Sequence, residues 1–336
     1  MINKKDIFII AEAGVNHNGS IETACRLIDA AADAGADAVK FQMWKTENVV
    51  TRNSKKAFYQ LQGIDDVETQ FEMLKRLELS PNDFLKLKQH CDDNNIIFIA
   101  TADEIESATF LNSIQNIFKV GSAELTDLPY LRKLARFNKP VLLSTGMGSL
   151  TEIDIALKEI IKHGVDKDDV VVLQCNTAYP TPLEDANVLA MVTLRDTLNV
   201  NVGYSDHTLG LEASIVAASL GAIVIEKHFT LDKDMEGPDH KISLEPDELK
   251  SMIRAIRNVK LVLGSGKKEV SQSEQKNMPL VRKSIVAKKI ILKGEIFDEN
   301  NITVKRPAGG IAPSLWDKVI GEKAIRDFNE DEVIAL

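Results

Sequence analysis

The chain has 336 residues, 44% of them hydrophobic, so it can bury a sizeable core in one large domain and a smaller one. Its formal net charge of -9 at pH 7 argues against a nucleic-acid or membrane-surface partner, because either polyanion would repel it. The three cysteines, Cys25, Cys91 and Cys175, are far apart, which disfavours a disulfide framework and a zinc knuckle. No apolar run approaches membrane-spanning length, and the amino terminus leads directly into a strand-like run, so we expect a cytoplasmic protein.

Short apolar runs alternate with longer amphipathic segments along residues 1–265, which is typical of repeated strand-helix units. Near-continuous apolar runs such as 170–173 indicate strands buried on both faces, as in a parallel sheet covered by helices. Eight such units in about 250 residues predict an α/β fold, a closed (β/α)8 TIM barrel. The expected strands are 7–11, 38–41, 96–100, 117–120, 141–143, 170–173, 200–204 and 222–225.

The chain divides into three parts that differ in residue composition and in the pattern of apolar residues. A helix expected over 245–263 closes the barrel domain, which we place at residues 1–265. Residues 266–281 are polar and turn-rich and predict a linker. Short strand-like runs with tight turns over 282–336 predict a small β-rich domain, which by its size has limited stability alone. The connection 43–66, after the second expected strand, is long enough to be a lid or a binding loop.

Polar and ionisable residues follow every expected strand. A barrel enzyme builds its active site from the carboxyl ends of its strands, so this distribution is the one expected of a catalyst. Taken singly, Thr101 and Ser144 could be helix N-caps, and Lys40 could be a solvated charge at a strand end. In chain order the residues are Glu12, Asn16, His17, Lys40, Gln42, Thr101, Asp103, Lys119, Ser122, Glu124, Ser144, 175–179, 205–207 and His228.

Two histidines, His207 and His228, each follow a strand, and the amphipathic segment 211–220 lies between them. A right-handed crossover makes the two strands parallel neighbours, so we expect both imidazoles at one sheet edge, where they could share a metal ion. Two neutral imidazoles suit Mn²⁺, Fe²⁺ or Zn²⁺ better than ions that prefer oxygen ligands alone. Taken singly, His207 could cap a turn, and His228 could be a satisfied buried histidine.

The other polar residues at the carboxyl ends of the expected strands suggest an anion site and acid-base chemistry. Glu12 and Glu124 follow the first and fourth strands, across the barrel mouth from each other, so we expect them to have different roles. No GxGxxG, Walker A or GxSxG motif supports a dinucleotide, nucleotide-triphosphate or serine-hydrolase function. Two lysines and three serines could form a cationic, hydrogen-bonding cup for a phosphate and a carboxylate. They are Lys40, Lys119, Ser122, Ser144 and Ser205.

Nine short motifs occur in order along the chain. They are AEAGVNHNG at 11–19, VKFQ at 39–42, KVGSAE at 119–124, LSTGM at 143–147, YPTP at 179–182, GYSDH at 203–207, EKHF at 226–229, GPDH at 237–240 and KRP at 305–307. With these motifs the chain resembles, over essentially its whole length, a sialic acid synthase, a member of the nonulosonic acid synthases.

The resemblance implies a barrel followed by an antifreeze-like (SAF) C-terminal domain, in a domain-swapped homodimer. Arg306 would then enter the active site of the partner. The implied reaction is that of a carbon–carbon bond-forming transferase, which condenses phosphoenolpyruvate with an N-acetylmannosamine-type sugar, an N-acylated hexosamine, and water. The products would be a nine-carbon 2-keto acid and phosphate.

The resemblance also implies roles for individual residues. A divalent metal, Mn²⁺ first with Mg²⁺ or Co²⁺ as alternatives, would be held by His207 and His228. Glu12 would handle protons of water or hydroxyl groups, and Glu124 would help to position the reacting carbon. Phosphoenolpyruvate would be bound by Lys40, Lys119, Ser122, Ser144 and Ser205. The sugar would be contacted by Gln42, Tyr179, Asp239 and Arg306.

The sugar itself is left open by the motifs. Segment 237–240 is more similar to the sialic and legionaminic branches than to the pseudaminic one, whereas 100–103 and Ala123 depart from the family pattern. We therefore expect N-acetylneuraminate or N,N'-diacetyllegionaminate synthase, with pseudaminic acid synthase as the alternative product class. A metal-dependent aldolase or hydrolase on the same barrel, and a non-catalytic carbohydrate-binding protein, are the competing functions.

Overall fold

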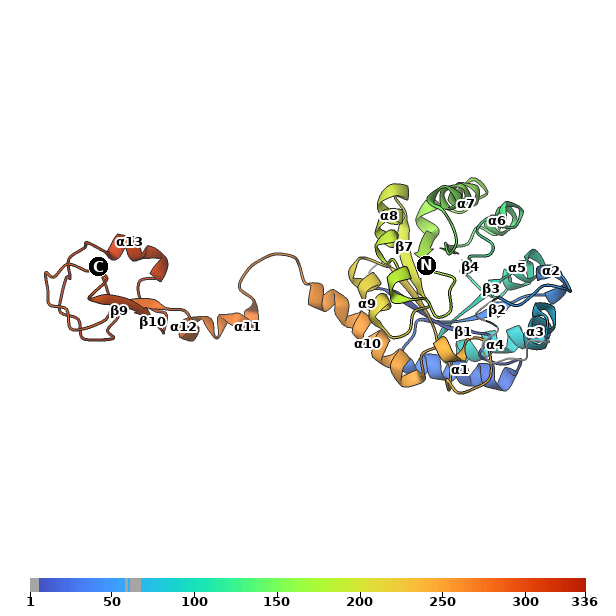
Figure 1. The fold of residues 1–336 in the computed structure, drawn as a ribbon, viewed down its shortest axis with the longest axis horizontal. Coiled ribbons are helices and arrows are strands. Elements are labelled where there is room, and N and C mark those ends of the chain that lie inside the picture. Colours follow the sequence, from blue (N-terminus) through green and yellow to red (C-terminus); the bar gives the residue numbers. More distant parts are fainter. Residues whose placement is uncertain (1–5, 58–59, 61–67) are drawn as a thin grey trace. The chain divides into compact units, whose positions relative to one another are not determined.

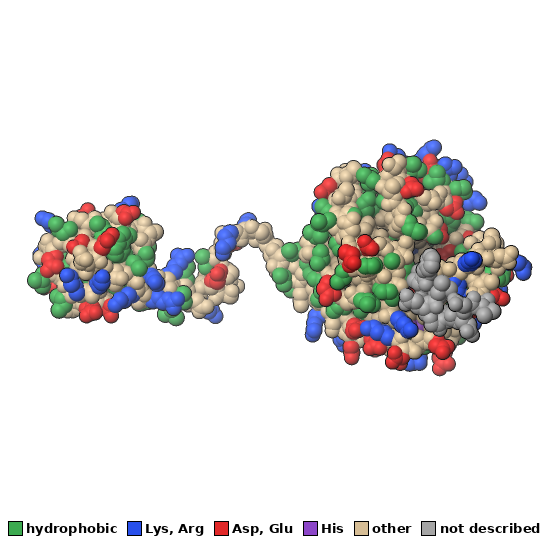
Figure 2. All heavy atoms as spheres, viewed as in Figure 1, with side chains coloured by type: hydrophobic (Ala, Val, Ile, Leu, Met, Phe, Trp, Pro, Cys, Tyr) green, Lys and Arg blue, Asp and Glu red, His purple; other side chains and the backbone are tan. Residues whose placement is uncertain are grey.

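The structure is a computed structural model that describes residues 6–57, 60 and 68–336. The chain forms two compact units, Met1–Gly264 and Ser265–Leu336 (Figure 1). Figure 2 shows acidic and basic side chains interspersed over the visible face of each unit. Within the described ranges, none of the helices is both long and apolar enough to cross a membrane.

The first unit is a closed barrel of eight strands that pair with their neighbours in sequence order, all in parallel. Helices surround the strands (Figure 1), so the expected TIM barrel is confirmed. The strands are β1 Phe8–Gly14, β2 Ala38–Met43, β3 Ile97–Ala102, β4 Phe118–Val120, β5 Val141–Ser144, β6 Val170–Gln174, β7 Asn201–Asp206 and β8 Val224–His228.

Several strands continue past the apolar runs that predicted them. β1 ends at Gly14, β2 at Met43 and β8 at His228. The apolar pattern missed these last residues because polar side chains interrupt it where the barrel interior changes from packed core to polar site. As a consequence, Glu12, Gln42 and His228 lie within the paired strands, which are more rigid than loops.

The helices begin and end at recognisable caps. The side chain of Ser20 accepts a hydrogen bond from the Thr23 amide at the start of α1, and Gly35 ends this helix with a φ of 86°. The N-cap of α5 is Glu104 and that of α7 is Ser149, so the interpretations of Thr101 and Ser144 as N-caps are wrong. The helices of this unit are α1 Ile21–Ala34, α2 Thr46–Val49, α3 Gln70–Leu77, α4 Pro81–Asp93, α5 Ile105–Leu111, α6 Leu128–Ala135, α7 Leu150–Lys162, α8 Leu189–Leu198, α9 Glu212–Ser219 and α10 Pro246–Leu263. Short 3-10 turns lie at Lys167–Asp169, Leu183–Asp185 and His240–Ile242.

The core has two layers because the side chains of a strand alternate between its faces. Ile10 belongs to a cluster of buried residues near the amino-terminal ends of the strands, inside the barrel. Ile9 and Ala11 belong to the larger cluster that packs the strands against the helices. Glu12, two residues after Ile10, therefore lies on the interior face, where the apolar filling gives way to ionic side chains.

The second unit is small and contains the antiparallel strands β9 Ser284–Ala287 and β10 Ile302–Lys305. Isolated bridges such as Ile291 with Phe328 extend the pairing, and buried apolar residues form a separate core. The segment expected as a linker contains two short helices. The helices of this unit are α11 Gln272–Gln275, α12 Met278–Val281 and α13 Trp316–Val319, with a 3-10 turn at Pro313–Leu315.

The connection 43–66, expected to be a lid or binding loop, lies partly outside the described residues. Helix α2, Thr46–Val49, occupies its first part. Residues 58–59 and 61–67 are among those not described. The lid function of this connection therefore stays a prediction.

Candidate active site

A buried ion pair between β1 and β2 forms the floor of the site. Lys40 Nζ lies 2.8 Å from Glu12 Oε2 and donates a hydrogen bond of 2.8 Å to Thr101 Oγ1 on β3. The side chains of Lys40 and Glu12 are only 3% and 1% exposed. The interpretation of Lys40 as a solvated charge is therefore wrong, and Thr101 serves as a buried acceptor.

Glu226 on β8 is the carboxylate that joins the two lysines. Its Oε1 atom lies 3.2 Å from Lys119 Nζ and accepts a hydrogen bond of 2.9 Å from Ser205 Oγ, and its Oε2 atom lies 3.8 Å from Lys40 Nζ. Glu226 is a site residue that the sequence pattern did not predict. The available signal was its position two residues before His228, which places both side chains on the same strand face.

The two carboxylates of this cluster differ in their ionisation. Burial raises the pKa of Glu12 to about 7, although Lys40 opposes the shift. Burial also favours the protonated form of Glu226, but Lys119 and Lys40 outweigh it and lower the pKa of Glu226. Burial also raises the pKa of Asp103, which follows β3 near Lys40, well above its usual range. With Glu12 and Asp103 protonated, two lysines face one ionised carboxylate, so the cluster carries a net positive charge in a low-dielectric interior and suits an anion.

Of the three serines expected to bind an anion, Ser205 lies on β7, and the other two lie after β4 and at the end of β5. Ser122 Oγ accepts a hydrogen bond of 3.0 Å from the Gly146 amide and lies 3.3 Å from Cys175 Sγ. The hydroxyl of Ser144 is buried and has no hydrogen-bond partner among the described residues. A buried hydroxyl without a partner is costly, which favours a ligand at this position.

The two histidines lie close together at the carboxyl ends of β7 and β8. The ring centroids of His207 and His228 are 5.5 Å apart, with 58° between the ring planes. Tyr179, which follows β6, stacks on His207 with centroids 4.1 Å apart and meets His228 edge-on at 5.8 Å. Three rings from three successive strand ends therefore gather at one place.

The state of the two imidazoles fits a metal ion. His207 Nδ1 bonds to the Asn176 carbonyl and must donate, which leaves the Nε2 lone pair free for a metal. His228 Nδ1 is buried without a hydrogen-bond partner among the described residues, so the interpretation of a satisfied buried histidine is wrong. Burial lowers the pKa of His207 to about 4 and that of His228 well below its usual range, so both rings are neutral at physiological pH.

These two histidines would bind a metal without a third protein ligand of the usual kind. In the part of the chain that the structure describes, no group of three or more His, Cys, Asp or Glu side chains is arranged to hold a metal ion. A metal held by His207 and His228 alone would keep several open positions for water or substrate, which is typical of catalytic rather than structural sites.

Gly14 lies where the Lys40–Glu12 ion pair approaches the histidines. A Cβ atom at Gly14 would lie 3.3 Å from Glu12 Oε1, 3.4 Å from His228 Cε1 and 3.5 Å from Gln42 Nε2. Gln42 also donates a hydrogen bond of 3.1 Å to Glu12 Oε1. Glycine is favoured here both by this close approach and by its φ of +51°.

Asp239 lies on the segment after β8, beside the histidines. Its Oδ2 atom is 3.9 Å from His228 Nδ1, and burial raises the pKa of Asp239 to about 6. Ser243 Oγ donates a hydrogen bond of 2.6 Å to the Asp239 carbonyl and accepts one of 2.9 Å from Asn16 Nδ2. The Asp239 segment is thus tied to the loop after β1.

Of the two remaining candidate residues, Glu124 adjoins this cluster, close enough for the charge of Lys119 to act on it, and Arg306 belongs to the other unit. Glu124 follows β4 and is half-buried, and burial raises its pKa to about 7. Arg306 is exposed and belongs to the second unit, just after β10, so the barrel unit does not itself supply it.

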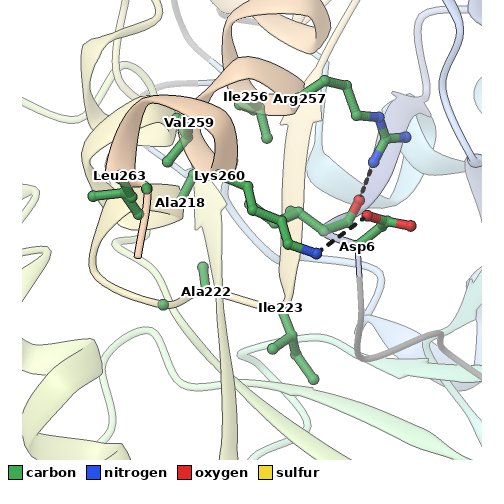
Figure 3. Close-up of a pocket in the computed structure, with 12 residues that line it drawn as sticks. Asp6, Ala218, Ala222, Ile223, Ile256, Arg257, Val259, Lys260 and Leu263 are labelled. Carbon is green, nitrogen blue, oxygen red and sulfur yellow. Dashed lines mark hydrogen bonds and ion pairs between the residues drawn. The ribbon is translucent and has the colours of Figure 1, made fainter. Parts of the chain in front are cut away.

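A pocket of about 300 Å³ lies elsewhere on the barrel unit (Figure 3). Asp6, Ala222 and Ile223 line it where β1 and β8 begin, together with Arg257 and Leu263 of α10. It is therefore at the amino-terminal end of the barrel, opposite the polar cluster.

Comparison with known proteins places the chain in a family. Residues 27–268 match the NeuB family, and residues 282–336 match the SAF domain. The chain is similar to the N,N'-diacetyllegionaminic acid synthase of Campylobacter jejuni, with 49% identity over 98% of this chain and 99% of the relative. A pseudaminic acid synthase of the same species is 36% identical over 96% of this chain and 94% of that protein.

The solved structures agree with this placement. The N-acetylneuraminic acid (sialic acid) synthetase of Leptospira borgpetersenii, solved in complex with citrate, has a TM-score of 0.70 and 34% identity. The match covers 82% of this chain and 91% of that one. Since the family match spans most of the chain and the relatives cover nearly all of it, the resemblance to the sialic acid synthases is confirmed, and the chain belongs to the NeuB family.

Proposed function

We propose that this protein is a nonulosonic acid synthase that condenses phosphoenolpyruvate with an N-acylated mannosamine-type sugar and water. In this reaction C3 of phosphoenolpyruvate bonds to the aldehyde carbon, water adds to C2, and the bond from C2 to the phosphate oxygen breaks. The observation that carries the proposal is the pair of neutral imidazoles, His207 and His228, at neighbouring strand ends in the same barrel mouth as Lys40 and Lys119.

The phosphoenolpyruvate site, in this proposal, is the buried lysine cluster with its neighbouring hydroxyls. Lys40 and Lys119 provide positive charge, and protonation of Glu12 leaves that charge in excess. Ser144 has a hydroxyl without a partner among the described side chains, as a phosphate or carboxylate oxygen would require. Ser122 and Ser205 complete the set assigned to this ligand.

A divalent metal, with Mn²⁺ as the first choice, is assigned to His207 and His228. When bound, the metal supplies Lewis-acid polarisation of the sugar carbonyl. The chain's own part is to hold both imidazoles neutral and to orient His207 through the Asn176 carbonyl. Tyr179, stacked on His207, excludes water from one face of this ring.

Proton handling is assigned to Glu12, and positioning of the reacting carbon to Glu124. Glu12 Oε1 accepts a hydrogen bond from Gln42, which is assigned to the sugar, and Oε2 faces Lys40, which is assigned to phosphoenolpyruvate. A proton on this carboxyl therefore lies between the two proposed substrate sites. A pKa near 7 lets Glu12 either hold or release that proton at neutral pH. Gln42 and Asp239, close to His228, are assigned to the sugar together with Tyr179.

For the sugar we favour the precursor of N,N'-diacetyllegionaminate, because the relative of that name is 49% identical over nearly the whole chain. N-acetylneuraminate synthesis is the second choice, and pseudaminate synthesis the alternative. We further propose a cytoplasmic, domain-swapped homodimer in which the exposed Arg306 of one subunit completes the sugar site of the other.

Phosphate release tests the function directly. The wild-type protein should release phosphate only with phosphoenolpyruvate, a divalent metal and one of a panel of N-acylated hexosamines all present. The double variant His207→Ala/His228→Ala should lose this activity. The matched control His90→Ala/His163→Ala removes two histidines that bond elsewhere, to Asp29 and to the Glu159 carbonyl, and should keep it.

Each competing function has its own outcome in this experiment. An aldolase or hydrolase would turn over a sugar without phosphoenolpyruvate. A carbohydrate-binding protein would bind the sugar equally well with and without a chelator. Phosphate release that survives the loss of both His207 and His228 would contradict the proposal.

A further inference from the structure

The residues that immediately precede the two histidines form a second, separate ion pair. Lys227 Nζ lies 3.0 Å from Asp206 Oδ2, and the two side chains are 1% and 0% exposed. In the pairing of β7 with β8, Asp206 and Lys227 are direct partners. The pair therefore links the two strands one residue before His207 and one residue before His228.

This ion pair lies on the face of the sheet opposite to the candidate site. Strand side chains alternate, so Ser205 and Glu226 point into the barrel, whereas Asp206 and Lys227 point outward. The outward direction is confirmed by Ser214 of α9, whose Oγ donates a hydrogen bond of 2.6 Å to Asp206 Oδ2. The pair thus has no access to a substrate in the barrel mouth.

The ion pair and its hydrogen bonds hold the two residues that flank His207 in the chain. Asp206 Oδ1 accepts from the amide of Thr208 at 2.9 Å and from its hydroxyl at 2.8 Å. Lys227 Nζ donates to the Thr208 carbonyl. Residues 206 and 208 are both held, so the backbone at His207 is clamped relative to the strand that carries His228.

We propose that Asp206 and Lys227 are positioning residues that set the separation of His207 and His228 and thereby the affinity of this pair for a divalent metal. A buried ion pair is a poor source of stability, because desolvation offsets most of the attraction. Its directional bonds, in contrast, specify distance and register in a way that apolar packing does not. The inference rests on the proposed function only in that the two histidines share a metal.

The test compares two Asp→Asn variants for Mn²⁺ binding without substrate. Asp206→Asn removes the carboxylate charge behind the histidines. Asp37→Asn removes a carboxylate that pairs with Arg257 Nη2 at 2.6 Å and accepts from the Ile9 amide at 2.7 Å, before β2 at the other end of the barrel. The concentration of free Mn²⁺, read from its electron paramagnetic resonance signal, gives Kd for each protein.

We expect Asp206→Asn to weaken Mn²⁺ binding by about tenfold or more, as for other residues that orient metal ligands. Asp37→Asn should stay within about twofold of the wild type, because it disturbs only the far end of the strands. Lys227→Arg, which keeps the charge and the donors, should bind Mn²⁺ better than Lys227→Met. Circular dichroism at the temperature of the titration establishes that each variant is folded, so loss of structure cannot produce the difference.

If Asp206→Asn does not fold, Ser214→Ala provides the measurement. It removes one donor to Asp206 without changing any charge and should weaken Mn²⁺ binding by about threefold, the effect of one hydrogen bond. The inference would be overturned if the folded Asp206 and Ser214 variants had the Kd of the wild type for Mn²⁺. It would also be overturned if Asp37→Asn lost as much Mn²⁺ affinity as Asp206→Asn, or if the wild-type protein bound no Mn²⁺. A wild type that binds Mn²⁺ with the expected variant pattern but releases no phosphate would contradict the proposed function alone.

Discussion

Lys40 Nζ lies 2.8 Å from Glu12 Oε2 inside the barrel, although burial holds the pKa of Glu12 at about 7. The Glu12 carboxyl therefore changes between its neutral and ionised forms in the physiological pH range while it stays beside a lysine. The charge of the cluster changes with it, from positive to neutral. This relationship links anion binding to proton uptake.

Phosphoenolpyruvate binding should accordingly weaken as the pH rises through 7. Burial raises the pKa of Glu12 above its ordinary value of 4.5, and a nearby anion raises it further, so binding takes up a proton. Above the pKa the affinity should fall by up to about tenfold per pH unit. Titration calorimetry at pH 8, in two buffers of different ionisation enthalpy, measures the proton uptake.

Glu12→Gln is the control for this prediction. The amide has the shape of the protonated carboxyl and does not titrate. The affinity of this variant for phosphoenolpyruvate should stay within about threefold between pH 7 and pH 8.5, because the carboxyl group that titrates in this range has been removed. Equal pH slopes for the variant and the wild type would show that Glu12 is not the group involved.

Glu226→Gln should destabilise the ligand-free protein and make it more responsive to phosphoenolpyruvate. The change leaves Lys119 and Lys40 buried without their shared carboxylate, which costs about 3 kcal/mol of unfolding free energy. A bound anion replaces the missing charge, so the increase in Tm with phosphoenolpyruvate should exceed that of the wild type. Thermal melts with and without the ligand measure both effects.

The comparison variant is Glu159→Gln, which removes an ion pair with Arg132 on the surface. This pair should contribute less than about 1 kcal/mol, since solvent screens it. Its ligand-dependent shift in Tm should equal that of the wild type. A Glu226→Gln protein with the stability and ligand response of the wild type would contradict the assigned role of Glu226.

His17→Gln should make the protein more resistant to acid. His17 is fully buried, and burial lowers its pKa from 6.5 to about 4. As the pH falls below 6.5 the unfolded chain gains a proton that the folded chain does not, so stability that is fully present above this pH is progressively lost. At pH 5 the loss from this one group is about 2 kcal/mol.

The measurement is urea unfolding at pH 8 and pH 5. Glutamine can still accept the hydrogen bond that His17 Nδ1 accepts from the Gly19 amide, so the fold should persist. The stability of His17→Gln relative to the wild type should rise by about 2 kcal/mol from pH 8 to pH 5. An unchanged difference between the two proteins would mean that His17 does not carry this pH dependence.

The proposed domain-swapped dimer predicts complementation between two inactive variants. Mixing Arg306→Ala subunits with Glu124→Ala subunits should restore about one quarter of the wild-type rate, because half of the dimers are mixed and each has one complete site. Phosphate release after subunit exchange measures the recovery. The double variant Arg306→Ala/Glu124→Ala, mixed with Arg306→Ala, cannot form a complete site and should restore none. If exchange is verified and the first mixture stays inactive, the two residues do not act across subunits.

The barrel and the position of the histidines could be predicted from local sequence. The period of the apolar residues and the right-handed crossover rule together place His207 and His228 at one edge of the sheet. The prediction of where each strand ends is less accurate, because residues such as Gln42 continue a strand with a polar side chain. A polar residue at a strand end and one at the start of a loop look the same in a sequence.

The amino-acid sequence alone thus predicts the order of the elements and the edge of the sheet at which the polar residues gather. The ion-pair partners of these residues follow from the folded barrel: Glu226 joins Lys40 to Lys119, and Asp206 and Lys227 lie behind the histidines. The physical reason is that strand and helix patterns depend on neighbours a few residues away. Ionisation states and ion pairs depend on burial and on charges contributed by strands far apart in the chain.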